Sequence, residues 1–177
     1  MRDMALSMGL LAVVVLLFVW LNGGLSVSGG RPADTEPAPT ADAVKEFADA
    51  PRVLPFTPAV PKNIPAGWHP NSAATTDPGT APAGTPLTVR GGWLVDGRFV
   101  GLVATNAAPA DLLSAEFAAA APDGGTVSAG GAEWTVTTGL RSEVAWFRTG
   151  ADKITYLITG SADQAAFRSV AASIAGS

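Results

Sequence analysis

Apolar residues are unevenly distributed along this chain of 177 residues. Residues 4–21 contain no charged side chain, and as a helix rising 1.5 Å per residue they would span about 27 Å, close to the roughly 30 Å of a bilayer core. Residues 26–39 are rich in Gly, Pro and Ser and show no apolar periodicity, so they cannot offset the entropy of ordering. We therefore predict one transmembrane helix over residues 4–25, a flexible linker over 26–39 and a folded domain over 51–177.

The apolar segment has two alternative interpretations. Ser26-Val27-Ser28 is a small-x-small pattern that suits cleavage of a signal peptide, although the apolar run is longer than the usual core of such peptides. A buried core helix is the other alternative, and apolarity on all sides of the helix argues against it. The short leader carrying Arg2 favours a cytoplasmic amino terminus, which places the following domain outside the cytoplasmic membrane.

The linker is followed by a short predicted helix and then by a proline-rich segment. The pattern over residues 40–50 predicts a helix capped by Thr40 and ended by Pro51. Prolines recur from residue 51 to residue 86, so this segment is expected to be extended or turning. Trp68, within the sequence PAGWHP, is predicted to anchor the segment onto the core of the domain.

Alternation and turn residues predict the remaining elements. Ser161 and Gln164 form an S-x-x-Q capping box ahead of the last helix. In chain order we expect a hairpin (87–95 and 98–106), a helix (109–121), a turn (123–125), strands (126–127 and 133–138), a second hairpin (143–148 and 154–159) and a helix (161–175). Hairpins separated by helices indicate an α+β fold, in which an antiparallel β-sheet is packed by two helices on one face.

The sequence GGWLVDGRFVGLVATN contains the most informative hairpin of the domain. Its Asp-Gly pair at residues 96–97 suits a type I′ turn, which fixes the strand register. In that register Gly92 lies opposite Gly101 and beside Phe99 on one face, whereas Trp93 points to the other face. The paired glycines leave a bare patch that another chain, an aromatic ring or a ligand could approach closely.

This patch is the candidate binding surface of the domain, and it has competing interpretations. The residues assigned to it are Gly92, Trp93, Phe99, Gly101 and Arg90. The first interpretation is structural, with a helix or a neighbouring aromatic ring lying across the glycines. The alternatives are the floor of a ligand site and pairing of the sheet edge with a partner protein.

Composition excludes several kinds of chemistry. The chain has no cysteine, which excludes disulfides, thiol catalysis and thiolate metal sites. His69 is its single histidine and lies in the proline-rich segment, so a histidine-dependent catalytic site is not expected. With 11 basic residues and a net charge of −4, the chain lacks the clustered cations that nucleic-acid binding needs. We therefore expect no enzyme activity, no catalytic residue, no metal, no cofactor and no nucleic-acid partner.

An ordered set of motifs resembles a known family. An amino-terminal apolar helix precedes PAGWHP, GGWLVDGRFVGLVATN and EVAWFRTGADKITYLITGSA, and a short helix closes the chain. This arrangement is similar to the domain-of-unknown-function family four-two-four-five, single-pass envelope proteins of high-GC Gram-positive bacteria. The resemblance implies a location and a fold and assigns no activity and no site.

The family resemblance and the predicted membrane anchor together lead us to expect a membrane-anchored protein of the cell envelope that acts as an interaction or scaffold module. The alternative is a ligand-binding domain for an envelope glycan, lipid or peptide. The expected partners are the lipid bilayer, through residues 4–25, and an envelope protein.

Overall fold

The computed structural model describes residues 41–117, 124–138 and 144–176. The predicted transmembrane helix, the linker and the predicted turn residue 123 lie outside these ranges, as do residues 118–121 of the predicted second helix and residue 143 of the second hairpin. Within the described ranges, no helix is both long enough and apolar enough to cross a membrane.

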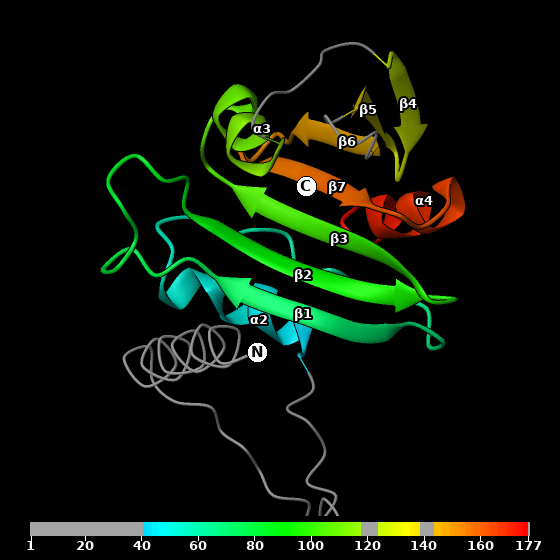
Figure 1. The fold of residues 1–177 in the computed structure, drawn as a ribbon, viewed down its shortest axis with the longest axis horizontal. Coiled ribbons are helices and arrows are strands. Elements are labelled where there is room, and N and C mark those ends of the chain that lie inside the picture. The colour runs from blue at the N-terminus through cyan, green and yellow to red at the C-terminus, as the bar shows by residue number, and fades with distance from the viewer. Residues whose placement is uncertain (1–40, 118–123, 139–143, 177) are drawn as a thin grey trace, which may run out of the picture. The chain divides into compact units, whose positions relative to one another are not determined.

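Seven strands form one antiparallel sheet with the order β1-β2-β3-β7-β6-β5-β4 (Figure 1). The strands are β1 (His69–Thr75), β2 (Thr88–Val95), β3 (Arg98–Thr105), β4 (Thr126–Ala129), β5 (Ala132–Thr138), β6 (Val144–Thr149) and β7 (Thr155–Gly160). The helices are α2 (Ala43–Asp49), the short 3-10 helix η1 (Ala50–Arg52), α3 (Pro109–Phe117) and α4 (Gln164–Ser173). The predicted α+β class is confirmed, and β1 adds a strand inside the proline-rich segment.

The β2–β3 hairpin has the predicted turn and register. Asp96 and Gly97 have φ angles of 49° and 75°, as a type I′ turn requires. Asp tolerates this left-handed conformation and Gly adopts it without steric cost. Gly92 pairs with Gly101 and Trp93 with Val100, as expected from a two-residue turn.

Two helix starts differ from the prediction. The amino-terminal cap of α2 is Asp42, whose carboxylate accepts a hydrogen bond from the Lys45 N–H at 2.9 Å, so Thr40 is not the cap. The cap of α4 is Asp163, whose carboxylate accepts from the Ala166 N–H at 2.9 Å. Ser161 instead accepts a hydrogen bond from the Phe99 N–H of β3, which draws it away from the helix. An aspartate nearer the first turn therefore replaced the hydroxyl residue in each case.

The helices cover both faces of the sheet, so the prediction of two helices on one face is wrong. The residues buried on α2 and α4 belong to a large cluster with Trp93, Leu102 and Ile158. Those buried on α3, Leu112 and Leu113, belong to a second cluster with Val103, Ala145 and Leu157. Neighbouring residues on a strand point to opposite faces, so these two clusters lie on opposite sides of the sheet. Figure 1 shows α3 in front of the sheet and α2 behind β1 and β2.

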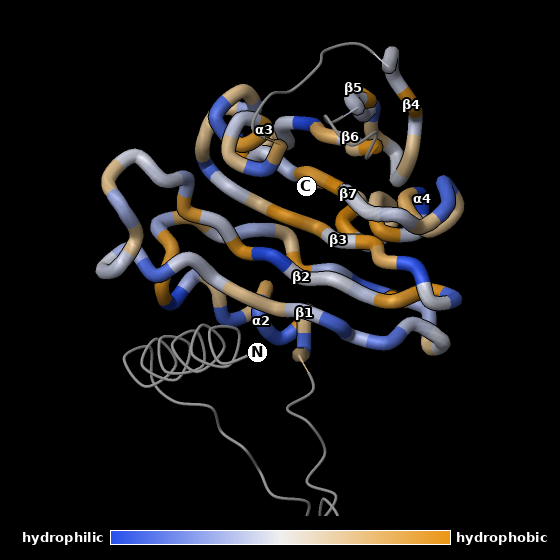
Figure 2. Tube along the Cα trace, viewed as in Figure 1, coloured by the Kyte–Doolittle hydropathy of each residue, from blue (hydrophilic) through white to orange (hydrophobic). Residues whose placement is uncertain are grey.

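The physical reason lies in the central strands. Tyr156, Leu157 and Ile158 are consecutive and fully buried on β7, and Leu102, Val103 and Ala104 are consecutive and buried on β3. A continuous apolar run is typical of a strand that is covered on both faces. Figure 2 shows β3 and β7 as the apolar centre of the sheet, with more polar strands at its edges. Because both faces of these strands are apolar, helices must pack on both faces of the sheet.

Tryptophan side chains dominate the larger cluster. Trp93, Trp134 and Trp146 are all buried, and large aromatic side chains of this kind dominate the energetics of a core. The Trp134 indole N–H donates to the Ala129 carbonyl at 3.1 Å, so its polar atom is satisfied. The Arg148 guanidinium lies 5.0 Å from the Trp134 ring centroid and 5.3 Å from that of Tyr156, and it closes one end of the core by cation–π contacts.

The proline-rich segment is fixed to the sheet at two points and to helix α4 at a third. Trp68 is half-buried, with its ring centroid 6.3 Å from that of Trp93, as expected for an anchor. The Ala59 N–H donates to the Tyr156 hydroxyl at 2.9 Å, and the Lys62 N–H donates to the Ser173 carbonyl at 2.9 Å. These contacts explain how a segment with few regular hydrogen bonds becomes ordered.

Candidate functional site

The bare glycine patch is covered by the protein itself. A Cβ added at Gly92 would collide with the Phe99 ring and would lie 2.6 Å from the Ser72 hydroxyl. A Cβ at Gly101 would lie 3.0 Å from the same ring. Phe99 therefore folds across both glycines, which is the structural interpretation considered for the hairpin. Its ring takes the space that the floor of a ligand site would need.

The other two residues of the predicted surface lie apart from this patch. Trp93 projects to the opposite face, where it is 1% exposed. Arg90 shares the face of Gly92, but its guanidinium donates to Glu116 of α3 at 2.8 Å and to the Thr88 hydroxyl at 3.3 Å. The structure thus brings Gly92, Gly101 and Phe99 together, buries Trp93 elsewhere and uses Arg90 to hold α3.

The outer edge of β1 is the first feature suited to recognition. The Thr76 N–H donates to the Thr88 carbonyl at 2.8 Å, so Thr76 faces β2. Because hydrogen-bonding direction alternates along an antiparallel strand, Ala74 also faces β2, whereas the backbone groups of Ala73 and Thr75 point outward. No described residue forms a hydrogen bond with these outward groups.

The opposite edge of the sheet, at β4, is capped at one position. The two-residue turn at 130–131 makes Ala129 face β5, so the Ser128 backbone points outward. The Arg168 guanidinium of α4 donates to that outward carbonyl at 2.8 Å. A side chain over an edge strand blocks the approach of another strand. The two edges of the sheet are therefore unequal: no described residue engages the outward groups of Ala73 and Thr75 on β1, whereas Arg168 occupies the outward carbonyl of Ser128 on β4.

The second half of β1 carries small side chains, and the first half contains an irregularity in its pairing with β2. From Ser72 to Thr75 the strand carries only Ser, Ala and Thr, with no charge. The register shifts between Pro70 and Ser72, which marks a bulge. Proline lacks an N–H, and a bulge bends an edge away from a would-be partner strand. Strand pairing on this edge is thus confined to the part that follows the bulge.

Helix α2 supplies charge beside the open edge. The Thr75 hydroxyl donates to the Glu46 carboxylate at 2.6 Å, which joins the helix to the strand. Lys45 donates to Asp49 at 2.7 Å, and this hydrogen bond raises the pKa of Lys45 and lowers that of Asp49. Arg52 reaches Asp49 as well, at 3.1 Å. The helix therefore presents a largely self-neutralised surface next to β1, which favours no particular charge on a partner.

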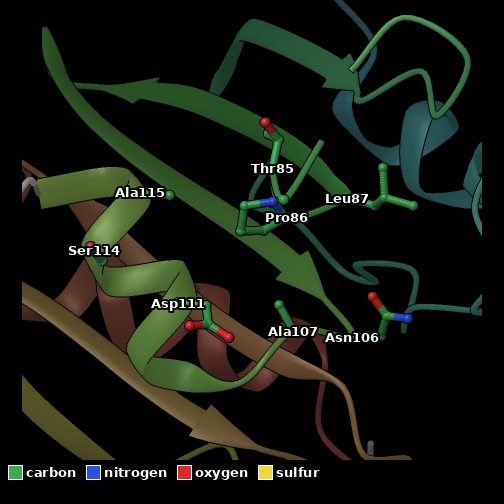
Figure 3. Close-up of a pocket in the computed structure, with 9 residues that line it drawn as sticks. Thr85, Pro86, Leu87, Asn106, Ala107, Asp111, Ser114 and Ala115 are labelled. Carbon is green, nitrogen blue, oxygen red and sulfur yellow. The ribbon is translucent and has the colours of Figure 1, made fainter. Parts of the chain in front are cut away.

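The second feature is a surface pocket of about 500 Å³ that is open to solvent, and it is called the cavity below (Figure 3). It lies between residues 84–87, which lead into β2, the connection that follows β3, and α3. Its polar side chains are Thr85, Asn106, Asp111 and Ser114. In Figure 3 Asp111 extends from α3 toward the side of the cavity formed by Pro86 and Ala107.

Sequence reasoning did not find either feature as a site. The sequence predicts the helix that carries Asp111 without singling out this residue, and it does not separate the β1 strand from the proline-rich segment. The run of small residues without proline or glycine at 72–75 is the one available signal for the strand. No local signal joins residues 84–87 to residue 111, because only the folded arrangement brings them together. Elsewhere, no three His, Asp or Glu side chains of the described residues gather as metal ligands would.

Comparison with known proteins gives one match. The model of the family described as protein of unknown function DUF4245 matches residues 1–174, so the chain belongs to that family. No curated protein and no solved structure matches the chain.

Proposed function

We propose that this member of the DUF4245 family is a membrane-anchored, extracytoplasmic interaction module of the cell envelope. In this proposal an extended segment of an envelope protein adds to the sheet as a strand beside β1. The observation that carries the proposal is the inequality of the two sheet edges, since Arg168 caps β4 while the outward groups of Ala73 and Thr75 have no partner among the described residues.

Strand addition suits the chemistry of this edge. Two outward residues offer two N–H donors and two carbonyl acceptors, and main-chain hydrogen bonds of this kind supply affinity in strand addition. The small side chains of Ser72, Ala73 and Ala74 leave room for those of an added strand. Pro70 and the bulge end the pairing on one side, so the added strand is short and its register is limited.

The apolar run over residues 4–21 supports the anchored part of the proposal, because its length and lack of charge suit a bilayer. An anchor holds the domain near other proteins of the same membrane and raises their effective concentration. A weak, short strand contact would then be sufficient for association. The proposal assigns no catalytic residue.

Site-specific photo-crosslinking in living cells tests the strand contact. A photoreactive residue at Ala74, which is exposed on β1, is expected to give a defined adduct with another envelope protein. The variant Ala73→Pro should abolish this adduct, because it removes one outward N–H and leaves the groups that face β2 unchanged. The matched control carries the photoreactive residue at Thr126, an exposed position on the capped edge, and should give no such adduct.

Two results would contradict the strand contact. One is an adduct that persists in the Ala73→Pro variant, and the other is an equal adduct from Thr126. An adduct between two copies of this chain would show that self-association replaces the proposed partner.

A carboxyl-terminal tag tests the anchored, extracytoplasmic part separately. In wall-stripped cells we expect added protease to remove the tag, while uncut protein remains with the membrane fraction. Protection of the tag would show that the orientation is reversed. Release of the domain into the medium would support cleavage near Ser28 instead of a permanent anchor.

A further inference from the structure

The cavity between residues 84–87 and α3 has walls that are fixed by buried hydroxyl groups. The Thr105 hydroxyl donates to the Leu87 carbonyl at 2.6 Å and accepts from the Ala107 N–H at 3.1 Å. The Thr155 hydroxyl donates to the Ala107 carbonyl at 2.9 Å. Both threonines are at most 1% exposed. Two of the three walls are therefore held by hydrogen bonds from the core of the sheet.

The third wall, α3, is also held firmly. Leu112 and Leu113 are buried in the second apolar cluster, which fixes the helix to β3, β6 and β7. Glu116 accepts the hydrogen bond from Arg90 of β2 at 2.8 Å. Cavities that bind small molecules are usually preformed in this way, and positioning groups on rigid elements keeps their geometry.

The chemistry of the lining selects against anions. Asp111 is the one ionisable side chain among the described residues that line the cavity; it is exposed, and no described residue donates a hydrogen bond to its carboxylate. In the part of the chain that the structure describes, no lysine or arginine lines the cavity, and the nearby Arg90 is engaged by Glu116 and Thr88. A phosphate or carboxylate ligand would meet a negative charge with no compensating cation. A protonated amine would instead gain a charge-assisted hydrogen bond from Asp111.

The remaining groups suit hydroxyls. Thr85 and Ser114 offer hydroxyl groups, and Asn106 offers both a donor and an acceptor. Pro86, Leu87 and Ala107 add an apolar side against which the C–H groups of a ring can pack. The volume of about 500 Å³ lies within the usual range for small-molecule sites.

We propose that this cavity binds an amino sugar with a free amine, whose ammonium group is held by Asp111 and whose hydroxyls are held by Thr85, Asn106 and Ser114. The site is separate from the β1 edge. It would let the domain recognise a glycan of its surroundings as well as a protein strand.

Calorimetric titration of the full-length chain in detergent tests this site with four defined probes. Glucosamine should bind with saturation. Glucose, which lacks the amine, and glucose 6-phosphate, which adds negative charge, should bind at least about tenfold more weakly, since loss of one charge-assisted hydrogen bond is worth about that factor. Ethanolamine carries an amine and one hydroxyl without the ring, and it should also bind more weakly than glucosamine.

Two variants locate the binding. Asp111→Asn should weaken the affinity for glucosamine by about tenfold and leave the affinity for glucose unchanged, because only the charge is removed. Ala115→Trp, at an exposed position of α3, should fill the cavity and abolish binding of glucosamine. The control is Asp96→Asn, which removes the same charge at the exposed hairpin turn, where Asn suits a positive φ equally well. It should bind glucosamine like the unchanged chain.

The proposal would be overturned by an absence of saturable glucosamine binding, by equal binding to the Asp111→Asn variant, or by a preference for glucose 6-phosphate. Equal affinity for ethanolamine would overturn the assignment to a sugar ring. None of these results depends on the β1 edge, and the crosslinking result does not depend on the cavity.

Discussion

Single residues decide how closely the layers of this domain approach. Gly91 lies under α2, where an added Cβ would be 2.6 Å from the Ala43 Cβ and 3.3 Å from the Ala43 Cα. Real Cβ atoms do not come that close, and a helix backbone cannot move aside as a flexible side chain can. The absence of a side chain at Gly91 therefore sets the distance between α2 and the sheet.

We predict that Gly91→Ala lowers the free energy of unfolding by about 1–3 kcal/mol, because overpacking forces the helix outward. Urea denaturation of the full chain measures this change. Gly67→Ala is the matched control, since a Cβ at Gly67 meets nothing within 4 Å, and it should stay within about 0.5 kcal/mol. Equal stability of the two variants would show that α2 is not seated as described.

At the same scale, the sequence predicted the hairpin and left open what covers its paired glycines. The Asp-Gly turn was sufficient to place Gly92 opposite Gly101 and beside Phe99, because turn length fixes the register. It could not show that the Phe99 ring lies across the glycines, since side-chain rotamers depend on neighbours from other strands. It also could not show that Glu116, 26 residues further along the chain, engages Arg90.

At the scale of elements, one hydroxyl ties the proline-rich segment to the sheet. The Tyr156 hydroxyl accepts from the Ala59 N–H at 2.9 Å and donates to the Asp152 carboxylate at 2.7 Å. Removing it leaves a part-buried N–H without its partner, which costs about 1–3 kcal/mol.

We predict that Tyr156→Phe destabilises the domain by that amount and opens the proline-rich segment to limited proteolysis. Asp152→Asn leaves the Tyr156 hydroxyl in place to accept from the Ala59 N–H, and it should have a smaller effect on both measurements. Unchanged proteolysis in the Tyr156→Phe variant would contradict the role assigned to this contact.

The β1 strand gives a second prediction for an element. Ala73→Pro removes an outward N–H, whereas Ala74→Pro removes one that faces β2. The second change breaks the ladder and should lower the free energy of unfolding by about 1–3 kcal/mol more than the first. Thermal or urea unfolding of the two variants measures the difference. The reverse order would show that the assigned direction of hydrogen bonding is wrong.

Local signals located the elements better than their starts. Apolar periodicity placed α4 and both hairpins close to their observed positions. The predicted amino-terminal caps of α2 and α4 lie two residues too early. In each helix an aspartate, Asp42 or Asp163, caps the first turn in place of the hydroxyl residue that precedes it. The strand β1 was hidden by the prolines on either side of it, and its hydrogen bonds to β2 became evident only in the fold.

At the scale of the whole domain, the fold class followed from the sequence and the layering did not. The buried run from Tyr156 to Ile158 already indicated a strand covered on both faces, so this signal was present and was not used. The cavity had no such signal. Its walls come from three segments whose proximity depends on the order of the strands in the sheet.

The central claim is that the β1 edge is open and available to a partner strand. Amide hydrogen exchange of the purified full-length chain, read residue by residue, tests it most directly. The account predicts alternation: the Ala74 and Thr76 amides, which face β2, exchange slowly, and those of Ala73 and Thr75 exchange nearly as fast as in an unfolded chain. If all four amides are equally protected, the edge is already occupied, and the proposed mode of recognition is wrong.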